Sequence, residues 1–139
     1  KMWWIYALLS AFFAALTAIF AKVGVENVHS NLATAIRTVV VLIMIWMIVF
    51  FRNEYKAIGE LSSRNWFFLT ISGIATGLSW VFYFKALQMG EVSKVAGIDK
   101  LSLALTIIFA AAFLGETLTW KTAVGATLII AGTLFLIWK

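Results

Sequence analysis

The sequence contains no cysteine, no proline and one histidine, His29, among its 139 residues. Without cysteine, the chain can form no disulfide bond, no thiolate nucleophile and no cysteine-ligated metal site. Without proline, any bend in a helix must come from glycine or from packing. His29 lies in a polar connector, where a solvated loop residue is expected rather than a proton relay. We therefore expect neither a metal nor another cofactor.

Charge is also scarce, because 12% of the residues are charged whereas 63% are hydrophobic. An average soluble domain has roughly a quarter charged and half apolar residues, so this composition predicts a membrane protein and not a water-soluble enzyme. The net charge is +5. Most Lys and Arg residues flank apolar runs, so we expect them to contact phospholipid headgroups and not nucleic acid.

Five apolar runs are long enough to cross a bilayer: residues 3–21, 32–51, 66–87, 95–114 and 120–138. The longest polar stretch, residues 52–65, is the predicted aqueous loop. Tryptophans mark the ends of these runs, as expected for amphipathic rings at headgroup level: Trp3, Trp4, Trp66, Trp120 and Trp138. We predict an all-α membrane protein, a single bundle of five transmembrane helices over residues 1–139.

The two faces of the membrane receive nearly equal positive charge. With a cytoplasmic N-terminus, five cations lie inside and four outside: Lys1, Arg52, Lys56, Arg64 and Lys121 against Lys22, Lys85, Lys94 and Lys139. A balanced count is expected for a chain that inserts in both orientations, which permits an antiparallel homodimer. Alternatively, the three cations of the 52–65 loop impose one orientation.

A few charged residues lie within the predicted spans, where each requires a partner, a wet cavity or a path to the surface. Lys22, Lys85 and Lys121 are close enough to span ends for their ammonium groups to reach the headgroups. Arg37 lies deeper, at a depth where reaching the headgroups is strained. Asp99 and Lys100 lie similarly deep, and a short carboxylate reaches the surface poorly, so Asp99 is the strongest candidate for a functional residue.

Polar side chains form a stripe on each of two helices. In the third span Ser72, Thr76, Ser79 and Tyr83 share one face, with Trp80 beside it. In the fourth, Ser102 and Thr106 share the face of Asp99. If both stripes face one cavity, it suits a zwitterionic or amphipathic metabolite. Alternatively, the hydroxyls bond helix to helix or back to their own backbone.

Small residues predict close helix packing in two spans. Gly73 and Gly77 form a GxxxG motif in the third span, and Gly125 and Gly132 mark one face of the fifth. The motif is weakly specific.

Several segments together resemble a known family. The strongest are FLGETLT at 113–119 and VGATLIIAGTL at 124–134, supported by AIFAK at 18–22, AIRT at 35–38 and SWVFYFKAL at 79–87. They are similar to EamA-type domains of the drug/metabolite transporter superfamily, and the likeness covers essentially the whole chain. Many relatives carry a proline in the fourth helix, where this sequence reads GIDKLS at 97–102.

The resemblance implies half of an inverted-repeat transporter. Typical members contain two five-helix repeats of opposite topology with the substrate site between them, so one repeat requires a second copy or a paralogous five-helix subunit. Glu116 belongs to the family signature, but an acid just before the fifth span also complements the helix dipole, so we assign it a structural role.

Two functions are consistent with the sequence. The first is a secondary transporter of small metabolites or amphipathic compounds, expected to be an exporter in the prokaryotic inner membrane, which works by alternating access as an antiparallel homodimer. Asp99 then binds a proton or an ammonium group, Lys100 or Arg37 a carboxylate, and Trp80 and Tyr83 stack on the substrate. The second is a structural or assembly subunit that transports nothing. An enzyme is not expected, because the spans hold no catalytic set.

Overall fold

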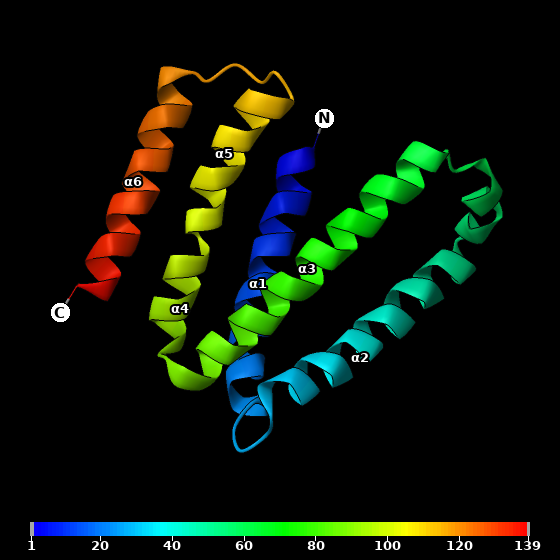
Figure 1. The fold of residues 1–139 in the computed structure, drawn as a ribbon, viewed down its shortest axis with the longest axis horizontal. Coiled ribbons are helices and arrows are strands. Elements are labelled where there is room, and N and C mark those ends of the chain that lie inside the picture. The colour runs from blue at the N-terminus through cyan, green and yellow to red at the C-terminus, as the bar shows by residue number, and fades with distance from the viewer. Residues whose placement is uncertain (1, 139) are drawn as a thin grey trace. The chain divides into compact units, whose positions relative to one another are not determined.

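A computed structural model describes residues 2–138, which are helical apart from short connectors and contain no strand. The elements are α1 Trp3–Gly24, α2 Ser30–Phe51, the 3₁₀ helix η1 Glu54–Glu60, α3 Ser63–Met89, α4 Val92–Asp99, α5 Leu101–Phe113 and α6 Trp120–Ile137 (Figure 1). Five segments are long and apolar enough to span a membrane, and α4 and α5 together form the fourth, Val92–Phe113. The expected all-α class with five spans is confirmed.

Most helices are longer than the apolar runs that predict them. α1 continues to Gly24, past Lys22, and α3 begins at Ser63, ahead of Arg64. A helix satisfies its own backbone groups whether it lies in lipid or among headgroups, so a charged residue ends the apolar run without ending the helix. The helices thus extend beyond most of the apolar runs, although α6 ends one residue earlier than the fifth run, and the span limits stay a prediction.

Left-handed backbone conformations occur in three connectors. Asn27 and Asn53, each with φ 57°, follow α1 and α2, and Gly115, with φ 68°, follows α5. Asparagine and glycine are the residues that most readily adopt positive φ, so these positions end the helices locally.

The chain forms two compact units. Unit 1 contains the residues up to Phe20 together with those from Met89 onward, and unit 2 contains Ala21–Gln88. In unit 1, α4 and α5 both pack along α6 (Figure 1). Their contact buries Ala104 and Thr133.

Unit 2 has its core where the end of α1, the start of α2 and the end of α3 meet. Val25, Phe84 and Leu87 are its most deeply buried side chains. Lys22 Nζ donates to the carbonyl of Leu87 at 2.6 Å. Gln88 Nε2 donates to the carbonyls of Val28, at 2.6 Å, and Val25, at 3.1 Å. Lys22 thus connects the last turn of α1 to the end of α3, and Gln88 connects the end of α3 to the α1–α2 connector.

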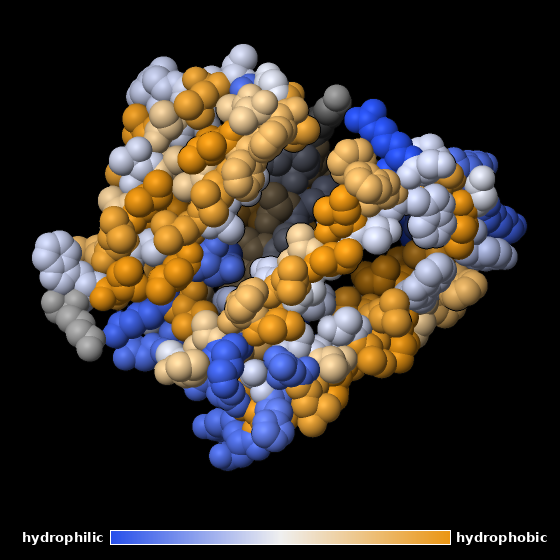
Figure 2. All heavy atoms as spheres, in the orientation of Figure 1, coloured by the Kyte–Doolittle hydropathy of each residue, from blue (hydrophilic) through white to orange (hydrophobic). Residues whose placement is uncertain are grey.

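Apolar side chains dominate the surface. In each of the five spans, 6% of the residues in the apolar window are buried within the chain. Hydrophobic residues cover most of the face drawn in Figure 2, and hydrophilic residues gather mainly near the connectors. Such a surface requires lipid or another membrane helix as its neighbour.

Candidate functional site

The fourth span is interrupted at Lys100. α4 ends at Asp99 and α5 begins at Leu101. The N–H of Lys100 is shared between the carbonyls of Ala96, at 3.3 Å, and Gly97, at 3.1 Å, and the N–H of Leu103 bonds to the carbonyl of Lys100 at 3.1 Å. Lys100 lies about 12 Å along the helix from Val92, inside the span. The helical hydrogen-bond pattern therefore tightens where two charged residues lie within the membrane.

Contacts with α6 lie three residues before this interruption. Thr133, 4% exposed, donates its hydroxyl to the carbonyl of Gly97 at 3.0 Å. A Cβ on Gly97 would lie 3.0 Å from Leu136 Cδ1, so only glycine permits this approach without a shift of Leu136. Thr133 was not among the predicted site residues, although it adjoins the small-residue face marked by Gly132.

Asp99 and Lys100 are held loosely. Lys100 Nζ lies 3.8 Å from Asp99 Oδ2, and their side chains are 62% and 41% exposed, respectively. An exposed pair of neighbouring residues contributes little stability by itself. Both side chains are available for contact with a ligand, a wet cavity or another subunit.

Ser102 and Thr106, which share the face of Asp99, are exposed, and the hydroxyl of Thr106 already donates one hydrogen bond. The hydroxyl of Thr106 donates to the carbonyl of Ser102 at 2.8 Å, within the same helix. Both residues are exposed. A threonine hydroxyl that donates to its own helix still accepts hydrogen bonds, so this face offers acceptors.

Unit 2 holds a second group of candidates around Arg37. The guanidinium carbon of Arg37, on α2, lies 5.1 Å from the ring centroid of Trp80 and 4.7 Å from that of Phe84, both on α3. Cation–π contacts of this kind stabilise a guanidinium in apolar surroundings. Among residues 2–138, no carboxylate pairs with Arg37. Its charge therefore remains available to an anion. Sequence reasoning identified Trp80 but missed Phe84, whose four-residue spacing from Trp80 is the available signal.

The polar stripe predicted in the third span, Ser72, Thr76, Ser79 and Tyr83 with Trp80 beside it, lies on α3, and some of its side chains already contact other groups of α3. Thr76 donates its hydroxyl to the carbonyl of Ser72 at 2.9 Å, so this hydroxyl bonds back to its own helix. Ser79 is exposed, whereas Trp80 and Tyr83 are half-buried. The ring of Tyr83 meets that of Phe84 edge-on, with centroids 5.9 Å apart.

The candidates therefore form one group in each unit. Unit 1 places Asp99 and Lys100 beside Ser102 and Thr106. Unit 2 joins Arg37 to the aromatic residues of α3. That both groups face one cavity stays a prediction.

Comparison with known proteins identifies the family. Residues 1–138 match the EamA-like transporter family. The chain belongs to this family. A Sinorhizobium sp. protein named as an uncharacterized transporter in the cobO 3′ region is 49% identical over 136 residues, which cover 98% of this chain and 96% of that protein. No solved structure matches. The EamA-like chain is thus a multi-pass membrane transporter.

Four glycines of this EamA-like chain have free space where a side chain would begin. A Cβ on Gly73, Gly77, Gly125 or Gly132 would find no heavy atom of residues 2–138 within 4 Å. Among the glycines, the close approach of a neighbouring side chain occurs at Gly97, which Leu136 contacts. Within its own unit, each of these four glycines therefore has an open face, and the close packing expected of them stays a prediction.

In the EamA-like chain, a threonine of the preceding connector caps the N-terminus of α6. The side chain of Thr119 accepts from the N–H of Thr122 at 3.2 Å. Glu116 lies earlier, where its N–H bonds to the carbonyl of Ala110 at 3.2 Å and closes the end of α5. Thr119, the residue directly before α6, is thus the N-cap of this helix, and the structural role assigned to Glu116 stays a prediction.

Proposed function

We propose that the chain is a secondary active exporter of small zwitterionic or amphipathic compounds. In this proposal Asp99 binds the coupling proton or an ammonium group, and Lys100 or Arg37 binds a carboxylate. Trp80 and Tyr83 stack on the substrate, while Ser79, Thr76, Ser102 and Thr106 line its path.

The observation that carries this proposal is the interruption of the fourth span at Asp99 and Lys100. Transporters place substrate and ion sites near the bilayer midplane, typically at helices that depart from regular geometry, and at Lys100 the helix tightens without unwinding. A charged side chain facing lipid at the centre of a helix costs roughly 2.5–3.5 kcal/mol on insertion scales. Two exposed charges at such a turn are therefore consistent with a wet or ligand-bound site and not with a lipid-facing one.

We further propose that two copies assemble as an antiparallel homodimer. The Sinorhizobium relative is matched over 96% of its own length, so it too has the size of one five-helix unit. The exposed charges at Asp99 and Lys100 and the open faces at the four glycines both require a covering surface. A second copy of opposite orientation supplies that surface and completes the inverted repeat.

Uptake driven by a pH gradient tests the transport proposal. Proteoliposomes are loaded to impose the gradient and given labelled zwitterionic amino acids or labelled tetraphenylphosphonium, an amphipathic cation. We expect the wild type to accumulate at least one probe, Asp99→Asn to lose at least tenfold in rate, and Glu60→Gln to match the wild type. Glu60→Gln is the control because Glu60 is an exposed carboxylate of η1.

Equal flux through wild type and Asp99→Asn contradicts the role of Asp99. No flux above empty liposomes for any probe favours the alternative, a non-transporting structural or assembly subunit. In that case Asp99→Asn lowers only the stability of the fold.

A further inference from the structure

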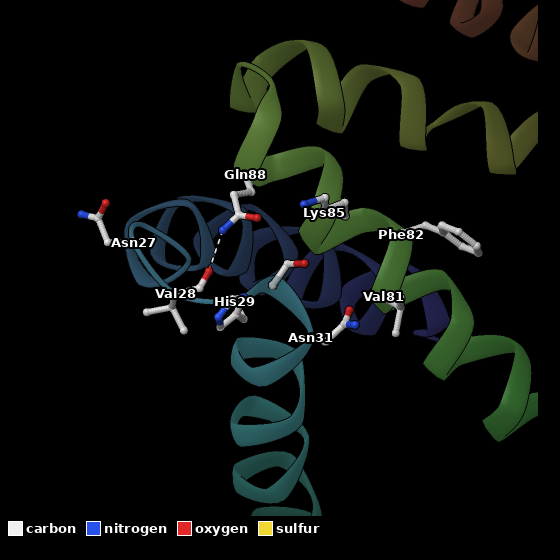
Figure 3. A pocket seen from close by; sticks show the side chains of 9 residues that line it. Asn27, Val28, His29, Asn31, Val81, Phe82, Lys85 and Gln88 are labelled. Carbon is white, nitrogen blue, oxygen red and sulfur yellow. Dashed lines mark hydrogen bonds between the residues drawn. The ribbon is translucent and has the colours of Figure 1, made fainter.

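Unit 2 contains an open cavity of about 610 Å³ between the beginning of α2 and the last turns of α3. In Figure 3, Lys85 and Gln88 on α3 lie across this space from His29 and Asn31 at the beginning of α2. Phe82 extends outward at the edge of the cavity. None of the proposed transport residues lines it.

Lys85 gives this cavity an uncompensated positive charge. None of the lining residues is acidic. Among residues 2–138, Lys85 forms neither a hydrogen bond nor an ion pair, unlike Lys94, whose ammonium lies 3.2 Å from Glu91. A cationic cavity without a carboxylate is suited to an anion.

Neutral donors surround the same space. The side chains of His29 and Asn31 line the cavity, and each can donate a hydrogen bond. The first turn of α2 also lies at this cavity, and no side chain caps its backbone N–H groups, so they are further donors. Gln88 is held by the carbonyls of Val25 and Val28, so the wall is fixed before any ligand binds. Several donors around one ammonium match the several oxygens of a phosphate.

The position of the cavity points to a bilayer lipid as the source of the phosphate. α2 begins at Ser30 and α3 ends at Met89, so the cavity lies at the ends of two membrane spans, where headgroups lie. From Lys85 the apolar side chains of Phe82, 71% exposed, and Val81 continue along α3 toward the span's interior. An acyl chain can follow these side chains while its headgroup occupies the cavity.

We propose that this cavity binds the phosphate headgroup of an anionic phospholipid. Lys85 supplies the charge, while His29, Asn31 and the first turn of α2 donate hydrogen bonds. Basic pockets between transmembrane helices recognise anionic headgroups by the same chemistry.

Native mass spectrometry of the full chain in detergent tests this site. The protein is titrated with phosphatidylglycerol and with phosphatidylcholine of identical acyl chains. We expect phosphatidylglycerol to bind about tenfold more tightly, Lys85→Gln to remove most of that preference, and Lys85→Arg to retain it. Lys56→Gln, which removes one exposed cation of η1, should bind both lipids as the wild type does.

Equal binding of the two lipids by the wild type overturns the proposal, and this result requires no variant to fold. Equal effects of Lys85→Gln and Lys56→Gln also overturn it, because the preference would then reflect net charge alone. Glycerol 3-phosphate and inorganic phosphate are added as competitors. Displacement of phosphatidylglycerol by either at equal concentration overturns the lipid assignment and indicates a soluble phosphate ligand. No transport is measured, so the result is independent of the proposed function.

Discussion

At the residue scale, the charged side chains inside the spans are accommodated in different ways. Arg37 lies against two aromatic rings of α3, so its delocalised charge is stabilised within one chain. Among residues 2–138, the side chains of Asp99 and Lys100 pair only with each other, at 3.8 Å, and remain exposed. This difference makes Arg37 partly a structural residue and leaves Asp99 and Lys100 dependent on what covers them.

Arg37→Lys should therefore reduce stability even though it keeps the charge. A lysine ammonium is compact and cannot stack as a planar guanidinium does on Trp80 and Phe84, so we expect a loss of about 1 kcal/mol in the free energy of unfolding. Denaturation of the purified protein in mixed micelles measures it. The matched control is Arg64→Lys, whose guanidinium lies 5.7 Å from the ring of Phe68 alone. An equal effect of the two substitutions would argue against a structural role for the Arg37 stack.

At the scale of elements, the fourth span depends on the fifth. The carbonyl of Gly97, which accepts the N–H of Lys100, also accepts the hydroxyl of Thr133 on α6. Without this bond, that carbonyl would lose a donor inside the membrane. We therefore expect the interruption at Lys100 to depend on the α4–α6 contact as well as on α4.

Replacement of Thr133 by valine tests this dependence, since valine has nearly the same shape but no donor. We expect Thr133→Val to lower the free energy of unfolding by about 1 kcal/mol, within the range measured for hydrogen bonds between membrane helices. It should also reduce transport, because the geometry at Asp99 changes. Thr133→Ser should restore most of both. Thr127→Val is the control, because the Thr127 hydroxyl bonds only to Ala123 of its own helix. A Thr133→Val protein that equals Thr127→Val in both measurements contradicts the account.

Much of the fold follows from hydropathy alone, because lipid requires each apolar run to form a helix. The five spans were predictable for this reason, whereas the break at Lys100 was not. We attribute it to the contacts of Gly97 with Thr133 and Leu136, which are far from it in sequence. The Arg37 stack was partly visible from the aromatic residues at 80 and 84. The cavity at Lys85 was not, because it requires the α1–α2 connector to fold back onto α3.

At the scale of the whole molecule, the proposed dimer depends on insertion in two orientations. The cations divide five to four between the two faces, so neither orientation is strongly favoured. A second copy in the opposite orientation would bring together the open glycine faces and cover the exposed charges.

The chain contains no cysteine, so single-cysteine reporters measure its topology directly. We expect Asn27→Cys and Lys56→Cys, in connectors on opposite faces of the membrane, each to be labelled in part by a membrane-impermeant maleimide in intact cells. Both should be labelled fully after permeabilisation. Complete labelling of one reporter and none of the other would show a single orientation and exclude the antiparallel homodimer.

The most direct test of the central claim is the movement of protons during transport. Proteoliposomes filled with a pH-sensitive dye receive a gradient of whichever labelled probe the wild type accumulates. We predict that the lumenal pH changes with the wild type, whereas Asp99→Asn exchanges the probe without a pH change. An unchanged pH with the wild type, or the same pH change with Asp99→Asn, would contradict proton coupling at Asp99.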